Sequence, residues 1–311
     1  MSKPSAWLIF NPGAGSSETD GNLTKIQLLL EAKFDLTIRL STENAGPRDL
    51  AKEAIANGAD LVIASGGDGT VSAVGGTLLN TQIPLGVIPT GTVNAFAAAL
   101  GIPSNIEDAC ITLVTGKPRV VDAARCNDTP IILEIGVGFE GKMMERTQST
   151  LKKRIGAFAY ILAGFQELRE LESFDVELTL EERMITLRAA AITIANAAPP
   201  QSVLAQGPDE IIYDDGLLDV TVVSPENISQ ALLASYSLLQ SSILGTKATR
   251  NDIGFFRVKR VKVKTNPPQQ VVIDGEDNGK TPIEVECLKD ALTVIVPKDT
   301  ISPKAIPLEE L

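Results

Sequence analysis

Short apolar runs alternate with helically spaced apolar residues over the first third of the chain. The runs lie at 6–10, 36–40, 61–64 and 85–88, and their length and β-branched content predict buried strands. Apolar residues recur every three or four positions over 23–30 and 50–55, which predicts helices, the second ended by Asn57-Gly58. Strands that alternate with helices at this pitch are typical of a parallel sheet with helices on both faces.

The pattern changes after about Asp122. Strand-like segments now follow one another at 129–139, 174–180, 185–195, 218–223, 257–264, 270–274 and 283–295, with long helical patterns only near 141–170 and 227–243. We therefore predict an α/β chain with a Rossmann-like three-layer domain over residues 1–122 and an antiparallel β-rich domain over 123–296. A C-terminal tail, 297–311, is expected to return to the first domain. A cleft between the two domains is the expected site.

The amino-acid composition excludes several classes of catalytic and binding site. The 311 residues carry 28 Lys and Arg against 39 Asp and Glu, a formal charge of −11, which argues against non-specific nucleic-acid binding. There is no histidine, which excludes Ser-His-Asp and Cys-His catalysis and His-containing zinc sites. Cys110, Cys126 and Cys287 form no CxxC pair, and no apolar run is long enough to span a bilayer. These features favour a cytoplasmic protein.

Two glycine-rich turns follow two of the predicted strands. Residues 66–70 read Gly-Gly-Asp-Gly-Thr, residues 89–94 read Pro-Thr-Gly-Thr-Val-Asn, and each turn precedes a helical pattern. Turns without side chains let backbone N–H groups approach an anion, and the helix start adds partial positive charge. The carboxyl ends of parallel strands share one sheet edge, so the two turns fit a polyphosphate. Asp68 is a candidate ligand for Mg²⁺ or a nucleotide oxygen; the alternative is a tight turn with Asp68 as a local cap.

A third loop, Asn11-Pro12-Gly13-Ala14-Gly15-Ser16, follows the first predicted strand. It has the GxG of a dinucleotide fingerprint, but Glu18 stands where the third glycine belongs, so that signal is weak. The same residues also fit a flexible loop that contacts phosphate at the carboxyl edge of the predicted sheet.

Acidic turns mark the β-rich half. Asp274-Gly275-Glu276 follows a strand pattern, and either acid suits phosphoryl transfer to a hydroxyl, although a solvated turn fits equally well. The segment 275–281 nearly spells a P-loop, but only three residues separate its glycines and Asn278-Gly279 reads as a hairpin turn. Asp214-Asp215-Gly216 suits a hard cation such as Mg²⁺, or a plain turn.

Taken in order, these motifs resemble the catalytic region of the diacylglycerol kinase and sphingosine kinase superfamily, in particular its soluble bacterial lipid kinases. The resemblance covers nearly the whole chain. It includes the two glycine turns, Asn11-Pro12, the stretch 156–160 with Gly164-Phe165, Asp214-Asp215-Gly216 and the segment 273–276.

The resemblance implies an α/β nucleotide domain, a β-sandwich-like domain, and ATP with Mg²⁺ as cofactors. It implies a structural Mg²⁺ held by the Asp215 side chain and the carbonyls of Ile212 and Leu217. Glu276, or less favourably Asp274, would accept the proton of the lipid hydroxyl, and Asp68 would act near the metal. The predicted nucleotide-binding residues are Asn11, Pro12, Gly13, Ala14, Gly15, Thr42, Gly66, Gly67, Asp68, Gly69, Thr70, Val71, Ser72, Ala73, Thr92 and Asn94.

The resemblance predicts an ATP-dependent lipid kinase that acts on a diacylglycerol-like or other amphiphilic lipid, in transient contact with a membrane surface. A homodimer is compatible with the sequence.

The chain departs from the bacterial pattern at Ser72-Ala73, where Asn-Glu is usual, and at Asn94-Ala95, where Asn-Asp is usual. The Asn-Ala form is more similar to the sphingosine and ceramide kinase branch. The alternatives are a kinase that resembles NAD kinases, which share Gly-Gly-Asp-Gly-Thr, and a nucleotide- or lipid-binding protein with weak activity.

Overall fold

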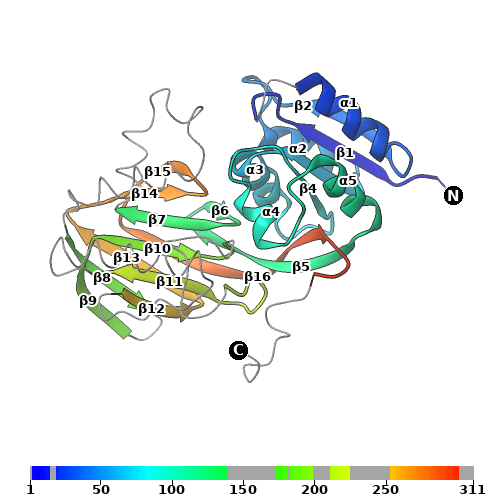
Figure 1. Ribbon diagram of the computed structural model, residues 1–311. Helices are drawn as coiled ribbons and strands as arrows, with labels where there is room; N and C mark the ends of the chain where they lie inside the picture. The colour runs from blue at the N-terminus through cyan, green and yellow to red at the C-terminus, as the bar shows by residue number, and fades with distance from the viewer. Residues whose placement is uncertain are drawn as a thin grey trace. The chain divides into compact units, whose positions relative to one another are not determined.

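The computed structural model describes residues 2–14, 19–138, 173–180, 183–198, 211–224 and 253–300. The chain divides into two compact units (Figure 1). The first comprises Met1–Ala123 with Lys289–Leu311, and the second comprises Ala124–Leu288. The helices expected near 141–170 and 227–243 lie outside the described residues.

The first unit is built on a parallel sheet. Strands β1 (Ser5–Phe10), β2 (Asp35–Leu40), β3 (Leu61–Gly66) and β4 (Leu85–Pro89) lie in the order β2-β1-β3-β4. The last part of β16 (Ile283–Val296) extends the sheet, pairing parallel to β4 at Val294 and Leu85. The strands β1, β3 and β4 are buried almost throughout, as expected for a sheet covered on both faces.

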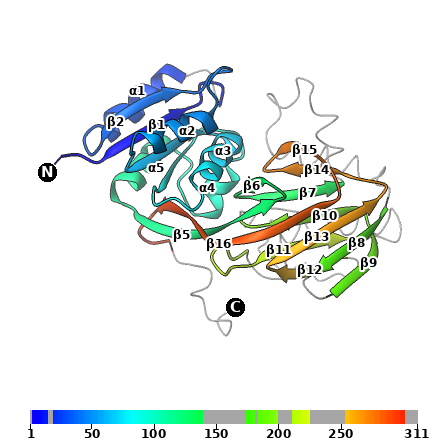
Figure 2. The same ribbon diagram turned by 180° about the vertical axis from the view of Figure 1, so that it is seen from behind.

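Helices cover both faces of this sheet (Figure 1; seen from behind in Figure 2). Helices α1 (Thr19–Leu30) and α5 (Ile106–Thr115) pack with each other and against the alternate β1 residues Ala6, Leu8 and Phe10. Helices α2 (Pro47–Ala56) and α3 (Asp68–Leu78) cover the opposite face, and the short α4 (Ala95–Ala99) follows β4. The predicted three-layer α/β architecture is confirmed.

The second unit consists of antiparallel sheets. In one, β16 pairs with β13 (Arg260–Asn266), β13 with β8 (Phe174–Leu180), and β8 with β9 (Arg183–Ala189). The other has the order β12-β11-β10-β7-β14-β15, with bounds Ile253–Val258, Leu218–Val223, Ala191–Ala195, Glu134–Gly138, Gln270–Ile273 and Glu276–Lys280. Strand β5 (Lys117–Cys126) pairs with β6 (Thr129–Ile131). Alternate residues of both sheets share one core, which includes Val137, Ile194, Val220, Val261, Val263 and Ile273.

Several strand predictions were wrong in their boundaries. The segment 185–195 is two strands, β9 and β10, which belong to different sheets and meet at Ala190. The segments 129–139 and 257–264 also each contain parts of two strands, β6 with β7 and β12 with β13. The breaks fall at Ile132-Leu133, Ala190 and Lys259, where no glycine, proline or asparagine gives a turn signal.

The prediction of a hairpin turn at Asn278-Gly279 was wrong, because the turn lies earlier in the sequence. The turn between β14 and β15 lies at Asp274 and Gly275, which both adopt positive φ (47° and 83°), and Ile273 pairs directly with Glu276. Positive φ at both central positions is typical of the tight turns that match strand twist. Asn278-Gly279 instead lies within β15, where the register against β14 is irregular.

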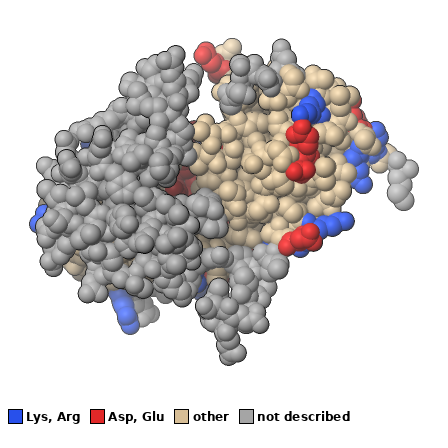
Figure 3. Space-filling view, in the orientation of Figure 1, with Lys and Arg blue, Asp and Glu red and all other residues tan. Residues whose placement is uncertain are grey.

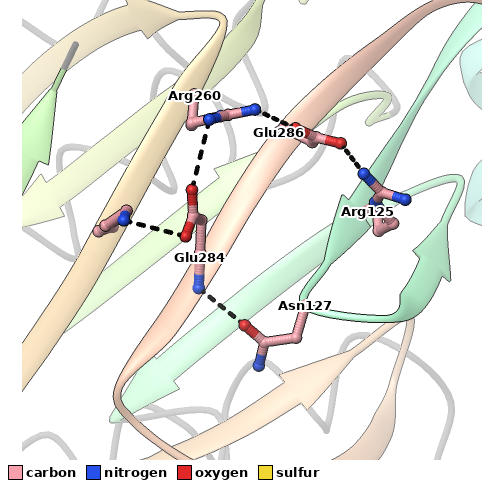
Figure 4. A network of polar contacts seen from close by, with 6 residues as sticks. Arg125, Asn127, Arg260, Glu284 and Glu286 are labelled. Atoms are coloured by element: carbon pink, nitrogen blue, oxygen red, sulfur yellow. Dashed lines mark hydrogen bonds and ion pairs between the residues drawn. The ribbon is translucent and has the colours of Figure 1, made fainter.

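A ladder of ion pairs crosses the outer side of β13 and β16 (Figure 4). Glu286 accepts hydrogen bonds from Arg125 and from Arg260, the latter at 2.6 Å. Glu284 pairs with Lys262 at 3.1 Å and with Arg260 at 3.6 Å. The two guanidinium groups lower the pKa of Glu286 below its ordinary value of 4.5.

This ladder predicts an acid-sensitive contribution to stability. A depressed carboxylate pKa stabilises the folded state fully above about pH 4.5, and that contribution is lost as pH falls through the folded-state value. Glu286→Gln should therefore lower the free energy of unfolding at pH 7 by about 0.5–1 kcal/mol. At pH 3 the difference from wild type should be smaller. Urea unfolding at both pH values measures it; an equal loss at both would contradict the assignment.

The face of the first unit visible in Figure 3 is mainly uncharged, and the cations on it lie beside carboxylates. This face offers no extended basic surface for nucleic acid. Within the described ranges, no helix is both long and apolar enough to cross a bilayer.

Candidate functional site

The carboxyl ends of four parallel strands bring the predicted loops to one sheet edge. Phe10, the last residue of β1, is in register with Leu40 of β2 and Ser65 of β3. Gly66 is in register with Pro89, the last residue of β4. The loops that begin at Asn11, Thr42, Gly67 and Thr90 therefore leave the sheet side by side, which is the edge at which such sheets bind ligands.

Asn11 connects the first loop to the second. Its backbone N–H donates to Ser65 O at 2.9 Å, and its Nδ2 donates to Thr70 Oγ1 at 2.9 Å. Its Oδ1 accepts the N–H of Gly13 at 2.9 Å, which closes a turn of the first loop. Asn11 thus fixes the exposed Pro12 and Gly13 beside the first turn of α3.

The two glycine turns meet through their backbones. Thr90 N–H donates to Gly66 O at 3.0 Å. A methyl group added to Gly91 would come within 2.4 Å of Gly67 Cα, and one added to Gly67 would come within 3.3 Å of Gly91 Cα. Because backbone atoms cannot move aside as side chains do, this approach requires glycine at position 91, and a side chain at position 67 would fit only tightly.

Helix α3 begins at this junction without a side-chain cap. Gly67 is its N-cap residue, with extended backbone and no side-chain hydrogen bond to the helix. The first N–H groups of a helix have no partner within the helix, and the helix dipole places partial positive charge on them. An uncapped start beside two glycines is suited to a phosphate group.

The side chains of Asn94 and Asp68 hydrogen-bond to the backbone of the second turn and of the helix after it. Asn94 has the left-handed conformation (φ 55°, ψ 47°); its Oδ1 accepts Gly91 N–H and its Nδ2 donates to Gly91 O, each at 2.9 Å. Asp68 Oδ1 accepts the N–H of Phe96 in α4 at 3.2 Å. One Asp68 oxygen therefore caps the neighbouring helix α4, and not the turn in which Asp68 itself lies, as the alternative interpretation of a local cap would require.

Two buried hydroxyls at the same strand ends have unsatisfied hydrogen-bonding capacity. Ser65 Oγ and Thr90 Oγ1 are both buried, and no atom within the described part of the chain hydrogen-bonds to them. Buried hydroxyls normally find a partner, so water or a ligand is expected here. The sequence placed Thr90 and Gly91 in the second glycine turn, but none of Ser65, Thr90 and Gly91 was predicted to bind nucleotide.

The remaining predicted nucleotide residues lie near this edge or outside the described chain. Thr42 is exposed and closes its own loop, donating to Ala45 O and accepting Ala45 N–H. Val71 is buried, so only its backbone is available. The others are the exposed Gly69 and Thr92 and the half-buried Ala14, Ser72 and Ala73; Gly15 lies outside the described residues. Their role in binding nucleotide stays a prediction.

The structure separates the two candidate acids of the second unit. Asp274 is buried, and its carboxylate accepts the N–H groups of Ile132 (3.1 Å), Leu133 (3.1 Å) and Glu134 (3.0 Å). Glu276 is exposed at the start of β15. Asp274 therefore holds the segment before β7 in place, whereas the Glu276 carboxylate is accessible for chemistry.

The predicted metal ligands lie in the turn before β11. Asp215 Oδ1 accepts the N–H of Leu217 at 2.9 Å, across Gly216 with φ 80°. Asp215 is half-buried, as are Ile212 and Leu217. Among the residues that the structure describes, no cluster of three or more His, Cys, Asp or Glu side chains could hold a metal. The predicted set contains one carboxylate and two carbonyls, all oxygen donors of the kind Mg²⁺ accepts.

The cysteines do not supply a reactive group here. Cys110, Cys126 and Cys287 form no disulfide bond with one another, and burial raises the pKa of Cys110 and of Cys126 to about 11. Both are therefore protonated and weakly nucleophilic at neutral pH.

Comparison with known proteins agrees with this architecture. Residues 5–126 match the model of the diacylglycerol kinase catalytic domain, and residues 134–296 match the YegS C-terminal NAD kinase beta sandwich-like domain. A diacylglycerol kinase of Bacillus subtilis is 30% identical over 94% of this chain and 97% of its own. An uncharacterised Synechocystis protein, sll0036, is 43% identical over 93% of this chain and 70% of its own.

A solved structure extends the likeness to three dimensions. The crystal structure of a diacylglycerol kinase from Bacillus anthracis has a TM-score of 0.75 and 26% identity, and the match covers 97% of this chain and all of that one. Two domain models in the expected order and relatives matched over nearly their full length show that the chain belongs to the bacterial diacylglycerol kinase-like family of lipid kinases.

Proposed function

We propose that the protein transfers the γ-phosphoryl group of ATP to the hydroxyl of a diacylglycerol-like or other amphiphilic lipid, with Mg²⁺. The observation that carries the proposal is the uncapped start of α3 beside the Gly67–Gly91 contact. Family membership supports kinase activity on a lipid alcohol. The family's relatives are named for diacylglycerol, and that substrate is carried over here as part of the proposal.

The first unit would bind the triphosphate mainly through its main chain. Backbone N–H groups at Gly67, Asp68 and Gly69, at the start of α3, are directed away from helical carbonyl partners and are available to phosphate oxygens. The loop that Asn11 holds against Thr70 lies beside them. Such preorganised donors stabilise charge that develops on the transferred group.

Glu276 would act as proton acceptor. The lipid hydroxyl oxygen forms a bond to the γ-phosphorus, the bond from that phosphorus to the β–γ bridging oxygen breaks, and ADP leaves. The hydroxyl proton passes to the Glu276 carboxylate, which is exposed and thus accessible. Asp274 is a poor acceptor, because three backbone N–H groups already occupy its oxygens.

Mg²⁺, when bound with the nucleotide, would neutralise phosphate charge. Asp68 has one oxygen on Phe96 N–H, which leaves its other oxygen to face the metal. Asp215, with the carbonyls of Ile212 and Leu217, would hold a second, structural ion. We also propose transient contact with a membrane surface, because the acceptor lipid resides there.

The test is incubation with [γ-³²P]ATP, Mg²⁺ and a total lipid extract, followed by identification of the labelled product. A parallel reaction contains NAD in place of lipid, because the second domain matches a model described as NAD kinase beta sandwich-like. We expect label in a chloroform-soluble phospholipid and none in NADP. Label in NADP alone would replace the proposal with an NAD kinase activity. ATP binding without any labelled product would identify a binding protein, consistent with alanine at positions 73 and 95.

A further inference from the structure

The second glycine turn contacts the first at three successive points. Near its start, Thr90 N–H donates to Gly66 O at 3.0 Å. Within it, Gly91 lies against Gly67, where even a methyl group would collide at 2.4 Å. After it, Phe96 N–H donates to Asp68 Oδ1 at 3.2 Å. Among the described residues, no hydrogen bond joins Gly91 to the first turn, and the hydrogen bonds of the Gly91 backbone go to Asn94.

The Asn94 side chain holds the Gly91 backbone. Its amide binds both polar groups of the Gly91 backbone, N–H to Oδ1 and C=O to Nδ2, in a closed ring with two distances of 2.9 Å. Asn94 has left-handed backbone geometry, which asparagine tolerates better than most residues. The side chain is half-buried and committed to Gly91 at both ends of its amide.

We propose that Asn94 is a positioning residue: it holds Gly91 against Gly67 and so fixes the start of α3 in the conformation that binds phosphate. This revises its expected role as a direct nucleotide ligand, and it rests on the proposed nucleotide site. The second turn then serves as a brace for the first. Preorganisation of this kind raises affinity because the free protein does not have to order the turn on binding.

The test compares Asn94→Gly with Asn105→Gly. Glycine readily adopts the left-handed conformation of Asn94, so the first variant removes the two side-chain hydrogen bonds without adding backbone strain. Asn105 is a matched control in the same unit: it is the N-cap of α5, and its Oδ1 accepts Asp108 N–H at 2.8 Å. Both variants lose an asparagine that hydrogen-bonds to backbone within three residues.

ATP affinity is measured by calorimetric titration without lipid, and hydrogen exchange is measured on nucleotide-free protein. Asn94→Gly should weaken ATP binding by about 10-fold, the equivalent of one or two net hydrogen bonds. KM for ATP should rise by a similar factor with kcat within about 3-fold of wild type, because the loss lies in binding. Amides of residues 66–72 should exchange faster. Asn105→Gly should change neither the affinity nor that exchange.

Three results would overturn the inference. If Asn94→Gly bound ATP with an affinity within 2-fold of wild type, Asn94 would not be a positioning residue for the nucleotide site. Weakened binding with unchanged exchange over 66–72 would make Asn94 a direct ligand. An equal loss of ATP affinity in Asn105→Gly would show that the effect of Asn94→Gly arises from a general loss of stability. Failure of wild type to bind ATP is a separate outcome, which rejects the proposed function and this inference with it.

Discussion

Glu276→Gln should lower the rate of phosphoryl transfer by about 10²–10⁴-fold, the usual contribution of a positioned proton acceptor. The amide keeps the shape of the side chain but cannot take the hydroxyl proton. Because Glu276 is exposed, the free energy of unfolding should stay within about 0.5 kcal/mol of wild type. Steady-state assays with ATP and labelled lipid, together with urea unfolding, measure both quantities. Retained turnover would remove Glu276 from the mechanism.

The matched variant, Asp274→Asn, should mainly lower the free energy of unfolding, whereas Glu276→Gln should mainly lower the rate. Three backbone N–H groups lose a charged acceptor, and the new Nδ2 group places a donor among donors. The free energy of unfolding should fall by about 3 kcal/mol. Asparagine tolerates the positive φ of 47° at this position, so backbone strain does not contribute. If Asp274→Asn proved as stable as wild type but inactive, Asp274 would take the catalytic role.

Gly91→Ala should weaken ATP binding on the order of 100-fold, because the new Cβ would lie 2.4 Å from Gly67 Cα and would displace the turn. Gly67→Ala should cost less, since its Cβ would lie 3.3 Å from Gly91 Cα. Titration with ATP at a temperature well below unfolding measures the order of the two effects.

Gly21→Ala is the control for this pair. It lies in α1, and a methyl group there would meet nothing within 4 Å. Alanine favours helix over glycine by about 1 kcal/mol, so this variant should raise Tm and leave ATP affinity unchanged. Equal ATP affinity in Gly91→Ala and Gly21→Ala would show that the contact between the turns has no part in binding.

The sequence predicted the first unit well because its signals are local. Each strand of the parallel sheet is a short apolar run, and the helices between them carry apolar residues at helical spacing. Asn11, Gly67 and Asp68 follow strands directly, so their place at the sheet edge follows from chain order.

The second unit was harder because its decisive contacts are distant in sequence. Nothing local distinguishes Asp274 from Glu276, since both are acids beside one glycine. The difference arises from the N–H groups of residues 132–134, about 140 positions earlier. The break at Ala190 was missed for a similar reason: β9 and β10 pair with strands of different sheets, and no glycine, proline or asparagine marks the junction.

Strand β16 has a consequence for how the chain folds during synthesis. Its first half pairs with β13 in the second unit, and its second half adds to β4 in the first. Asp290 N–H donates to Asp122 Oδ1, and Asn80 N–H to Ala291 O. Until the ribosome releases this last strand, β4 is an open edge and neither unit is complete. Late, non-local closure of this kind slows folding, and an unpaired strand edge is a site at which chains associate.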